Sequence, residues 1–369
     1  FDAVDSAGDV RVVCPSAAPV TTFGDLSPEW VLAIDARTTL APSEFELGVN
    51  AFESSQAPAP MVLVIATERG GRVLGPNAAL CVGGALRRQA MSMNFFPGLG
   101  ITSYQATVDP VALSPKTLEV FGAALELGQL TGGALDVTIA PLVEAWGFGP
   151  DGVATTAPEA EQLAALVETV GLDKLTLDAE AGTLRKSVPD LYCDLSSLAK
   201  GYAVDRVLER LLADGFDDVL VEIGGEVRTS GRNVEGAPWR LGIESPFAVP
   251  GQVQRVLSLE NEALATSGDY RSYREIDGRR VSHLIDPRTG LPVEHKVASV
   301  SVVAPTCMRA DALATALMVM GEDEGFELAE REGVAALFLV RDGESFAEKT
   351  TTEFQSRFPA GPAGSPAAP

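Results

Sequence analysis

The chain has 369 residues, 46% of them hydrophobic, which is enough to bury one large core or two smaller ones. Its 51 acidic residues outnumber 28 basic ones and give a formal net charge of −23, which disfavours binding to nucleic acid or to anionic membranes. The same charge repels free nucleotides, so a phosphate-handling site in this chain needs a cation or local backbone N–H groups.

Cysteine and histidine usage narrows the chemistry further. The four cysteines are scattered without C-x-x-C spacing, which disfavours zinc ribbons and redox pairs. Cys193 and Cys307 lie beside apolar runs and are expected to behave as small core residues. Only two histidines are present, His283 and His295, so a His-rich metal site is excluded.

The chain divides into three parts. Prolines interrupt every periodic pattern in residues 1–59, which are expected to form an N-terminal extension of uncertain structure. Residues 60–355 carry regular patterns and are expected to fold as the main domain. Residues 356–369 are rich in Pro, Ala and Gly and predict a disordered tail.

The predicted elements begin with a strand at 61–65 and a helix at 115–127, which Ser114 caps and whose apolar face carries Leu118, Phe121 and Leu125. Thr156 and Glu159 form a capping box for a helix that runs to residue 170. The remaining elements are a strand at 174–177, a helix that ends near 215, strands at 219–223, 239–243 and 297–303, helices at 311–320 and 324–332, and a hairpin at 342–343. The irregular alternation predicts an α+β fold with mixed, largely antiparallel sheets flanked by helices.

Two segments suggest a site for a cation and an anion. Asp311 and Thr315 are four residues apart on a predicted helix, so a carboxylate and a hydroxyl share one face, and such hard oxygen ligands suit Mg²⁺. The alternative is that Asp311 simply caps its own helix. Lys200 lies in the first turn of another predicted helix, where a cation is unfavourable, which indicates a nearby anion or carboxylate. The alternative is a surface lysine.

Two further segments are weaker by themselves. The Gly-Gly pair within residues 222–231 follows a buried strand and permits close backbone approach to a ligand, or forms only a turn. His283 precedes a proline-containing turn and is a candidate general base, although a core histidine is the simpler interpretation.

In this order and spacing, the segments together resemble the ApbE family, the FAD:protein FMN transferases. The motifs that carry the resemblance are Gly133-Ala-Leu-Asp-Val-Thr138, Ala140-Pro-Leu-Val-Glu-Ala-Trp-Gly-Phe-Gly149, Asp194-Leu-Ser-Ser-Leu-Ala-Lys-Gly201, Ser267-Gly-Asp-Tyr270, Ser282-His-Leu-Ile-Asp-Pro-Arg-Thr-Gly290 and Ala310-Asp-Ala-Leu-Ala-Thr315.

The resemblance implies an ApbE-like fold and an Mg²⁺-dependent reaction. In this reaction, a Thr or Ser hydroxyl of an acceptor flavoprotein attacks FAD, FMN is transferred and AMP leaves. It implies His283 as the base for the acceptor hydroxyl and Asp311 as a catalytic metal ligand. The implied metal positions are Ser197, Asp311, Ala314 and Thr315, with Ser197 and Ala314 binding through backbone oxygens. The implied FAD contacts are Phe95, Ala134, Leu135, Asp136, Asp194, Lys200 and Ile285.

The resemblance also implies an acceptor that is a subunit of an electron-transport complex. No nucleic-acid partner is expected, because of the net charge of −23. It implies a periplasmic protein, or one facing the periplasm from a membrane anchor that precedes Phe1. The flavin wall departs from the family pattern, because Met91-Ser-Met-Asn-Phe-Phe-Pro-Gly-Leu-Gly100 lacks the usual acidic residues and Phe95 replaces the stacking aromatic. Two alternatives therefore stay open, an FAD pyrophosphatase that yields FMN and AMP, and a non-catalytic FAD-binding protein.

Overall fold

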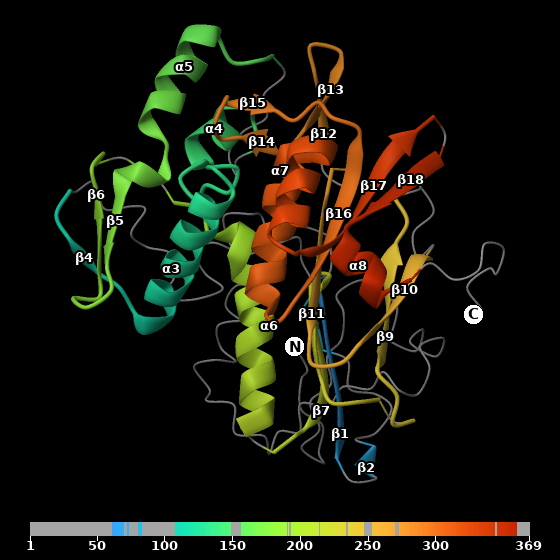
Figure 1. Ribbon diagram of the computed structural model, residues 1–369. Coiled ribbons are helices and arrows are strands. Elements are labelled where there is room, and N and C mark those ends of the chain that lie inside the picture. The colour runs from blue at the N-terminus through green and yellow to red at the C-terminus, as the bar shows by residue number, and fades with distance from the viewer. Residues whose placement is uncertain are drawn as a thin grey trace.

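The computed structural model describes residues 108–148, 156–189, 191, 193–213, 215–233, 235–246, 253–269, 273–343 and 345–359, together with the backbone of strands at 61–69, 72–73 and 80–82. Residues 1–59 and Phe95 lie outside this part of the chain. Figure 1 shows a central sheet with two long helices, α6 and α7, in front of it.

The central sheet has nine strands among the described residues, in the order β18-β17-β16-β11-β8-β7-β1-β2 with β3 also on β1. Its strands are β1 (Met61–Arg69), β2 (Arg72–Val73), β3 (Leu80–Val82), β7 (Asp218–Ile223), β8 (Glu226–Ser230), β11 (Ala263–Gly268), β16 (Val297–Ala304), β17 (Ala335–Asp342) and β18 (Ser345–Thr350). Every pairing between described strands is antiparallel, which confirms the predicted α+β class.

Smaller sheets surround the central one. They are formed by β4 (Val111–Ala112), β5 (Leu175–Asp178) and β6 (Thr183–Lys186), by β9 (Trp239–Glu244) with β10 (Val253–Leu259), by β12 (Tyr273–Ile276) with β13 (Arg279–Ser282), and by β14 (Ile285–Asp286) with β15 (Leu291–Pro292). The helices are α3 (Pro115–Leu130), α4 (Ala140–Ala145), α5 (Ala160–Thr169), the 3₁₀ turn η3 (Leu172–Lys174), α6 (Ser196–Ala213), α7 (Cys307–Arg331) and α8 (Thr352–Arg357). None of the described helices is both long and apolar enough to cross a membrane.

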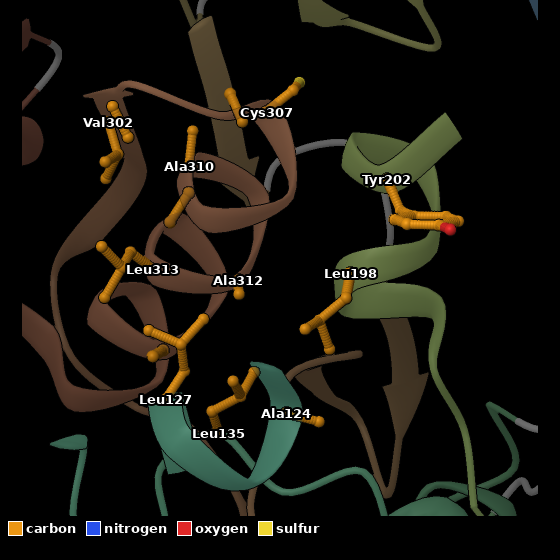
Figure 2. Close-up of a cluster of buried hydrophobic side chains, with 14 of the residues drawn as sticks. Ala124, Leu127, Leu135, Leu198, Tyr202, Val302, Cys307, Ala310, Ala312 and Leu313 are labelled. Carbon is orange, nitrogen blue, oxygen red and sulfur yellow. The ribbon is translucent and has the colours of Figure 1, made fainter. Parts of the chain in front are cut away.

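The two faces of the central sheet carry separate hydrophobic cores. On one face, α6 and α7 pack on each other and on the sheet, with α3 against both. Figure 2 shows Leu127 of α3, Leu198 of α6 and Leu313 of α7 gathered in this core. On the other face, side chains of β9, β10 and α8 pack on the alternate residues of the same strands, among them Trp239 and Phe354. The alternation of strand side chains thus separates the helical layer from the second core.

Several predicted elements are confirmed with adjusted ends. Ser114 caps α3 by accepting a hydrogen bond from the N–H of Thr117 at 3.1 Å. Its buried ridge runs through Val120, Phe121 and Ala124, whereas Leu118 and Leu125 are only half-buried. The prediction was therefore correct for Phe121, but the buried face of α3 is rotated away from Leu118 and Leu125. Thr117 and the small residues Ala124 and Gly128 face the core instead.

Two expectations about helix starts were wrong. The capping box does not form, since Glu159 itself occupies the N-cap position of α5 without a side-chain cap. α7 begins at Cys307, so Asp311 lies inside a helix and does not cap it, and the helical path breaks at Gly321 (φ 81°) between the two predicted helices. The domain boundary predicted at residue 355 falls inside α8, which ends at Arg357.

Candidate functional site

A cavity of about 290 Å³ opens between the first turns of α6, the middle of α7 and the loop that follows α3. It is lined by Ala134, Leu135, Asp136, Ile139, Val143, Asp194, Ser196, Ser197, Lys200, Thr266, Ser267, Gly268, His283, Leu284, Ile285, Asp311, Thr315 and Val319. Residues from widely separated motifs therefore meet at one place.

The cavity contains nearly all the site residues predicted from the sequence. Those that line it are Ala134, Leu135, Asp136, Asp194, Ser197, Lys200, His283, Ile285, Asp311 and Thr315. Ala314 does not line it, because its side chain is buried in the core of the helical layer. Its carbonyl as a metal ligand stays a prediction, and Phe95 lies outside the described residues.

The first wall is the loop that ends α3. Thr131 closes the helix by donating its hydroxyl to the carbonyl of Leu127 at 2.8 Å, and it accepts a hydrogen bond from the N–H of Leu135 at 3.1 Å. Asp136 then accepts from both the N–H and the hydroxyl of Thr138, at 2.7 and 2.6 Å. These bonds fix residues 134–136 as a rigid edge of the cavity.

Burial raises the pKa of the Asp136 carboxyl, and the hydrogen bonds from Thr138 offset part of that rise. The second wall is the start of α6. It is joined to the loop after α3, because the N–H of Asp194 donates to the carbonyl of Val137 at 2.6 Å. Asp194 in turn accepts from the N–H of Ser196, the first residue of α6, at 2.8 Å. These hydrogen bonds fix the position of the start of α6 relative to the loop after α3.

The third wall is a charged contact between α6, α7 and the start of β8. Lys200 forms an ion pair with Glu226, and its Nζ lies 3.7 Å from Oδ1 of Asp311. The other carboxylate oxygen of Asp311 accepts from the N–H of Gly201 at 3.0 Å. The side chain of Lys200 is 24% exposed, against 3% for Glu226 and 7% for Asp311, so the lysine is the member that reaches the cavity most openly.

The members of this cluster shift one another's pKa values. Burial alone would lower the pKa of the Lys200 ammonium, but the carboxylates of Asp311 and Glu226 raise it above its ordinary value. Burial raises the pKa of both carboxyls, and Lys200 counteracts part of each rise. The expected anion near Lys200 is confirmed, and it consists of two protein carboxylates.

A second polar contact aligns α7 with α6. Asp205 of α6 accepts from the N–H groups of Cys307 and Met308 at 2.8 and 2.9 Å, so it caps α7 from a neighbouring helix. Arg228 of β8 donates to the same carboxylate at 2.8 Å. Gly201 allows the close approach of the two helices, since a Cβ there would lie 2.3 Å from the carbonyl oxygen of Cys307.

His283 lines the cavity from the segment between β13 and β14. It is half-buried, and its ring meets Phe148 edge-on with 6.5 Å between the centroids. The neighbouring turn is anchored by Trp146, whose indole N–H donates to the carbonyl of Gly290 at 2.8 Å. A half-buried histidine that lines the cavity can accept a proton from a hydroxyl that enters it.

The oxygen atoms near Asp311 fit Mg²⁺ by their chemistry. Asp311 supplies a carboxylate and Thr315 a hydroxyl one helical turn later, and both line the cavity. Ser197, predicted to bind through a backbone oxygen, lines it from the start of α6. Within the described ranges, no group of three or more His, Cys, Asp or Glu could hold a metal by side chains alone. A cation with few protein charges around it relies on substrate phosphates, as Mg²⁺ commonly does.

Sequence reasoning missed some lining residues and one charged partner. Thr266, Ser267 and Gly268 end β11 and line the cavity, although the motif that begins at Ser267 was given no site role. Glu226 directly follows the Gly224-Gly225 turn, and only the tertiary structure reveals that it contacts Lys200. The Gly-Gly pair was the available signal, since it fixes a two-residue hairpin and therefore the position of the next residue.

Comparisons with known proteins place this geometry in a family. The model of the ApbE family matches residues 95–338. A FAD:protein FMN transferase from Haemophilus influenzae is 45% identical over 249 residues, which cover 67% of this chain and 72% of that protein. One from Vibrio cholerae is 46% identical over 247 residues, covering 67% and 73%. The solved flavin transferase ApbE from Vibrio cholerae superposes with a TM-score of 0.68 at 37% identity, over 80% of this chain and 95% of that one.

Proposed function

This chain belongs to the ApbE family of FAD:protein FMN transferases, and we propose that it moves FMN from FAD onto a Thr or Ser hydroxyl of an acceptor flavoprotein, with Mg²⁺ bound and AMP released. The enzyme is a flavin transferase. The observation that carries the mechanistic proposal is the cavity, which brings His283, Lys200 and the pair Asp311 and Thr315 together from separate motifs.

The substrate would lie with its phosphates toward α6 and α7. The N-terminal end of α6 presents backbone N–H groups that favour anions, and Lys200 offers an N–H donor whose charge is offset by Glu226 and Asp311. In a chain of net charge −23, these donors together with a bound Mg²⁺ would allow an anionic nucleotide to stay. The apolar residues Leu135, Ile139 and Ile285 offer contacts to the flavin portion.

Asp311, Thr315 and Ser197 would hold the metal. Mg²⁺ bound there would neutralise charge on the pyrophosphate as it is cleaved. The Asp311 carboxylate is oriented for this role by its hydrogen bond from Gly201, which engages one oxygen. Its other oxygen stays 3.7 Å from Lys200, beyond a normal hydrogen bond.

His283 would act on the acceptor. Its imidazole takes the proton of the incoming hydroxyl, the hydroxyl oxygen bonds to the FMN-side phosphorus, and the bond from that phosphorus to the bridging oxygen breaks. AMP leaves with the bridging oxygen, and FMN remains joined to the acceptor through a phosphoester. Pre-placement of the hydroxyl beside the phosphate contributes by proximity.

The test is to incubate the protein with FAD, Mg²⁺ and an acceptor flavoprotein subunit that carries the target threonine. We expect the acceptor to gain the mass of one FMN with one AMP released per transfer, and a chelator or a Thr→Ala acceptor to abolish the gain. Release of FMN and AMP without modification of the acceptor would assign a pyrophosphatase instead. Tight FAD binding without turnover at any Mg²⁺ concentration would assign a binding protein.

We further propose that the acceptor is a subunit of an electron-transport complex and that the two proteins meet on the periplasmic side of the membrane. The support is membership of the family alone, in which exported forms are common. Deletion of the gene in its own host, followed by mass spectrometry of membrane flavoproteins, should reveal an unflavinylated periplasm-facing subunit. Loss of flavin only from soluble cytosolic proteins would contradict this proposal.

A further inference from the structure

Glu226 is a buried carboxylate that none of the steps above uses. Its side chain is 3% exposed, it does not line the cavity, and it reaches the site only through its ion pair with Lys200. Its second oxygen, Oε2, is fully buried and has no hydrogen-bond partner among the described residues. A buried charged oxygen without a partner is costly, so the position calls for an explanation beyond packing.

A simple hydrogen bond does not explain the carboxylate. A glutamine at this position would still present an amide oxygen to the Lys200 ammonium, without burying a charge. What a glutamate adds is the negative charge beside the ammonium. The charge therefore acts on the other two members of the cluster, Lys200 and Asp311.

The geometry of the cluster is asymmetric. Lys200 is hydrogen-bonded to Glu226, whereas its Nζ stays 3.7 Å from Oδ1 of Asp311. The ammonium is thus held on the β8 side, and this oxygen of Asp311 is not consumed by a hydrogen bond from the lysine. When both carboxyls are ionised, the cluster carries one net negative charge, which favours a bound cation. Burial works against that state, since it raises the pKa of both carboxyls, that of Glu226 to about 8.

The backbone fixes Glu226 for this task. The Gly224-Gly225 turn has positive φ at both glycines (66° and 101°), as a two-residue hairpin requires, and it pairs Ile223 with Glu226 at the first position of β8. Arg228, two residues later on the same strand face, binds Asp205 of α6. β8 therefore places one acidic side chain, Glu226, and one basic side chain, Arg228, against α6.

We propose that Glu226 is a positioning residue of the transfer site, which holds Lys200 away from Asp311 and so keeps that carboxylate available to the divalent cation. This inference rests on the proposed function, because it takes Asp311 as the metal ligand. Without the Glu226 charge, Lys200 has only Asp311 as a charged partner in the cluster. The lysine then competes with the metal for the same oxygen.

The experiment measures metal binding directly, using Mn²⁺ as a paramagnetic probe in the presence of FAD, on the wild type and on Glu226→Gln. We expect roughly tenfold weaker Mn²⁺ binding in Glu226→Gln, because the Lys200 ammonium then competes with the cation for Asp311. In parallel, the Mg²⁺ concentration that gives half-maximal transfer should rise by a similar factor. The KM for FAD and the melting temperature should change little.

Two further variants make the result specific. Glu226→Asp keeps the charge but withdraws it by one methylene, and should weaken Mn²⁺ binding only about threefold. Glu348→Gln removes a negative charge from β18, where Glu348 pairs with Arg255 at 2.7 Å, and should bind Mn²⁺ as the wild type does. A purely structural role for Glu226 would lower the melting temperature without shifting the metal requirement.

The outcomes separate this inference from the proposed function. Wild-type Mn²⁺ affinity in Glu226→Gln would overturn the positioning role, and if that variant does not fold, unchanged affinity in Glu226→Asp would overturn it. Weaker binding in the variants of a wild type that transfers no FMN would support the positioning role and reject the proposed reaction. A wild type that binds no divalent cation with FAD would overturn both.

Discussion

At the scale of single residues, the site depends on a few side chains whose environment is set by helix packing. Asp311 shows this most clearly, since one of its oxygens accepts from Gly201 and the other lies near Lys200. Removing its charge while keeping its shape should separate catalysis from folding.

We expect Asp311→Asn to reduce transfer by at least about 100-fold, because the metal loses its one carboxylate ligand from the protein while the amide oxygen can still accept from Gly201. The melting temperature should stay within a few degrees of the wild type. Steady-state transfer over a Mg²⁺ series, with thermal unfolding as the control for folding, checks this. Unchanged turnover would reject the metal assignment.

His283→Ala should slow transfer by about 100-fold or more, because general-base catalysis is lost. FAD affinity should fall only about threefold, since the histidine is proposed to act on the acceptor hydroxyl and not to hold FAD. Single-turnover rates and equilibrium FAD titrations measure the two quantities separately. An equal loss of both would indicate a structural histidine.

The sequence predicts these residues by motif but not their partners. A negative charge near Lys200 could be inferred, since a cation in the first turn of a helix needs a nearby anion. Glu226 could not be identified as that anion, because it lies 26 positions away and only the packing of β8 on α6 brings the two together. The absence of a site role for Ala314's side chain likewise follows from which face of α7 is buried.

At the scale of elements, the contact of α6 with α7 builds the site. Asp205 caps α7 and Gly201 lets the two backbones come close. Periodicity predicted α6 well, because its apolar residues recur on one face. It placed the start of α7 too late, since the first turn, which begins at Cys307, is capped by a carboxylate from another helix and carries no local cap signal.

We expect Gly201→Ala to destabilise the protein by about 1–3 kcal/mol, because its Cβ would overlap the backbone of Cys307 and push α7 away. Transfer activity should fall with it, since Asp311 moves with α7. Gly122→Ala is the matched control in α3, where the nearest atom to the new Cβ is 4.0 Å away. This control should be neutral or more stable by about 0.5–1 kcal/mol, as helix propensity predicts. Chemical denaturation of both variants decides, and equal stabilities would contradict the close-packing argument.

At the scale of the whole molecule, the described cysteines report on global unfolding. Cys193 and Cys307 are buried within the helical core, as expected from their apolar neighbours. Burial raises the pKa of the Cys193 thiol to about 12, and burial also raises the pKa of Cys307. Both thiols therefore stay protonated, and unreactive, at pH values where an exposed cysteine is partly thiolate.

We expect neither thiol to be alkylated in the native protein at pH 8, and both to be alkylated rapidly in denaturant, where their pKa values return to the ordinary range. Peptide-resolved mass spectrometry after timed alkylation measures this for each cysteine. The labelling rates of the two should rise together with denaturant concentration, since both lie in one core. Rapid native labelling of either would show that this core opens locally.

The fold class was predictable at this scale because the alternation of strands and helices is irregular, and every described pairing is antiparallel. The strand order was not predictable. β11 lies between β8 and β16 although β9 and β10 intervene in the sequence, and they form a separate sheet on the opposite face. The strand order depends on which apolar faces of the sheet are covered by other elements, and the local sequence pattern does not contain that information.

The hydrogen bonds that join α6 to α7 also set the order in which the enzyme becomes competent during folding. Gly201 and Asp311 are 110 positions apart in the chain, and Asp205 and Cys307 are 102 apart. Loop closure over such distances is slow, so the site assembles after the local hairpins. On the ribosome, Lys200 and Asp205 emerge long before α7 does, and they stay hydrated until it docks. A chain truncated before Cys307 would keep most of its motifs and yet lack a site.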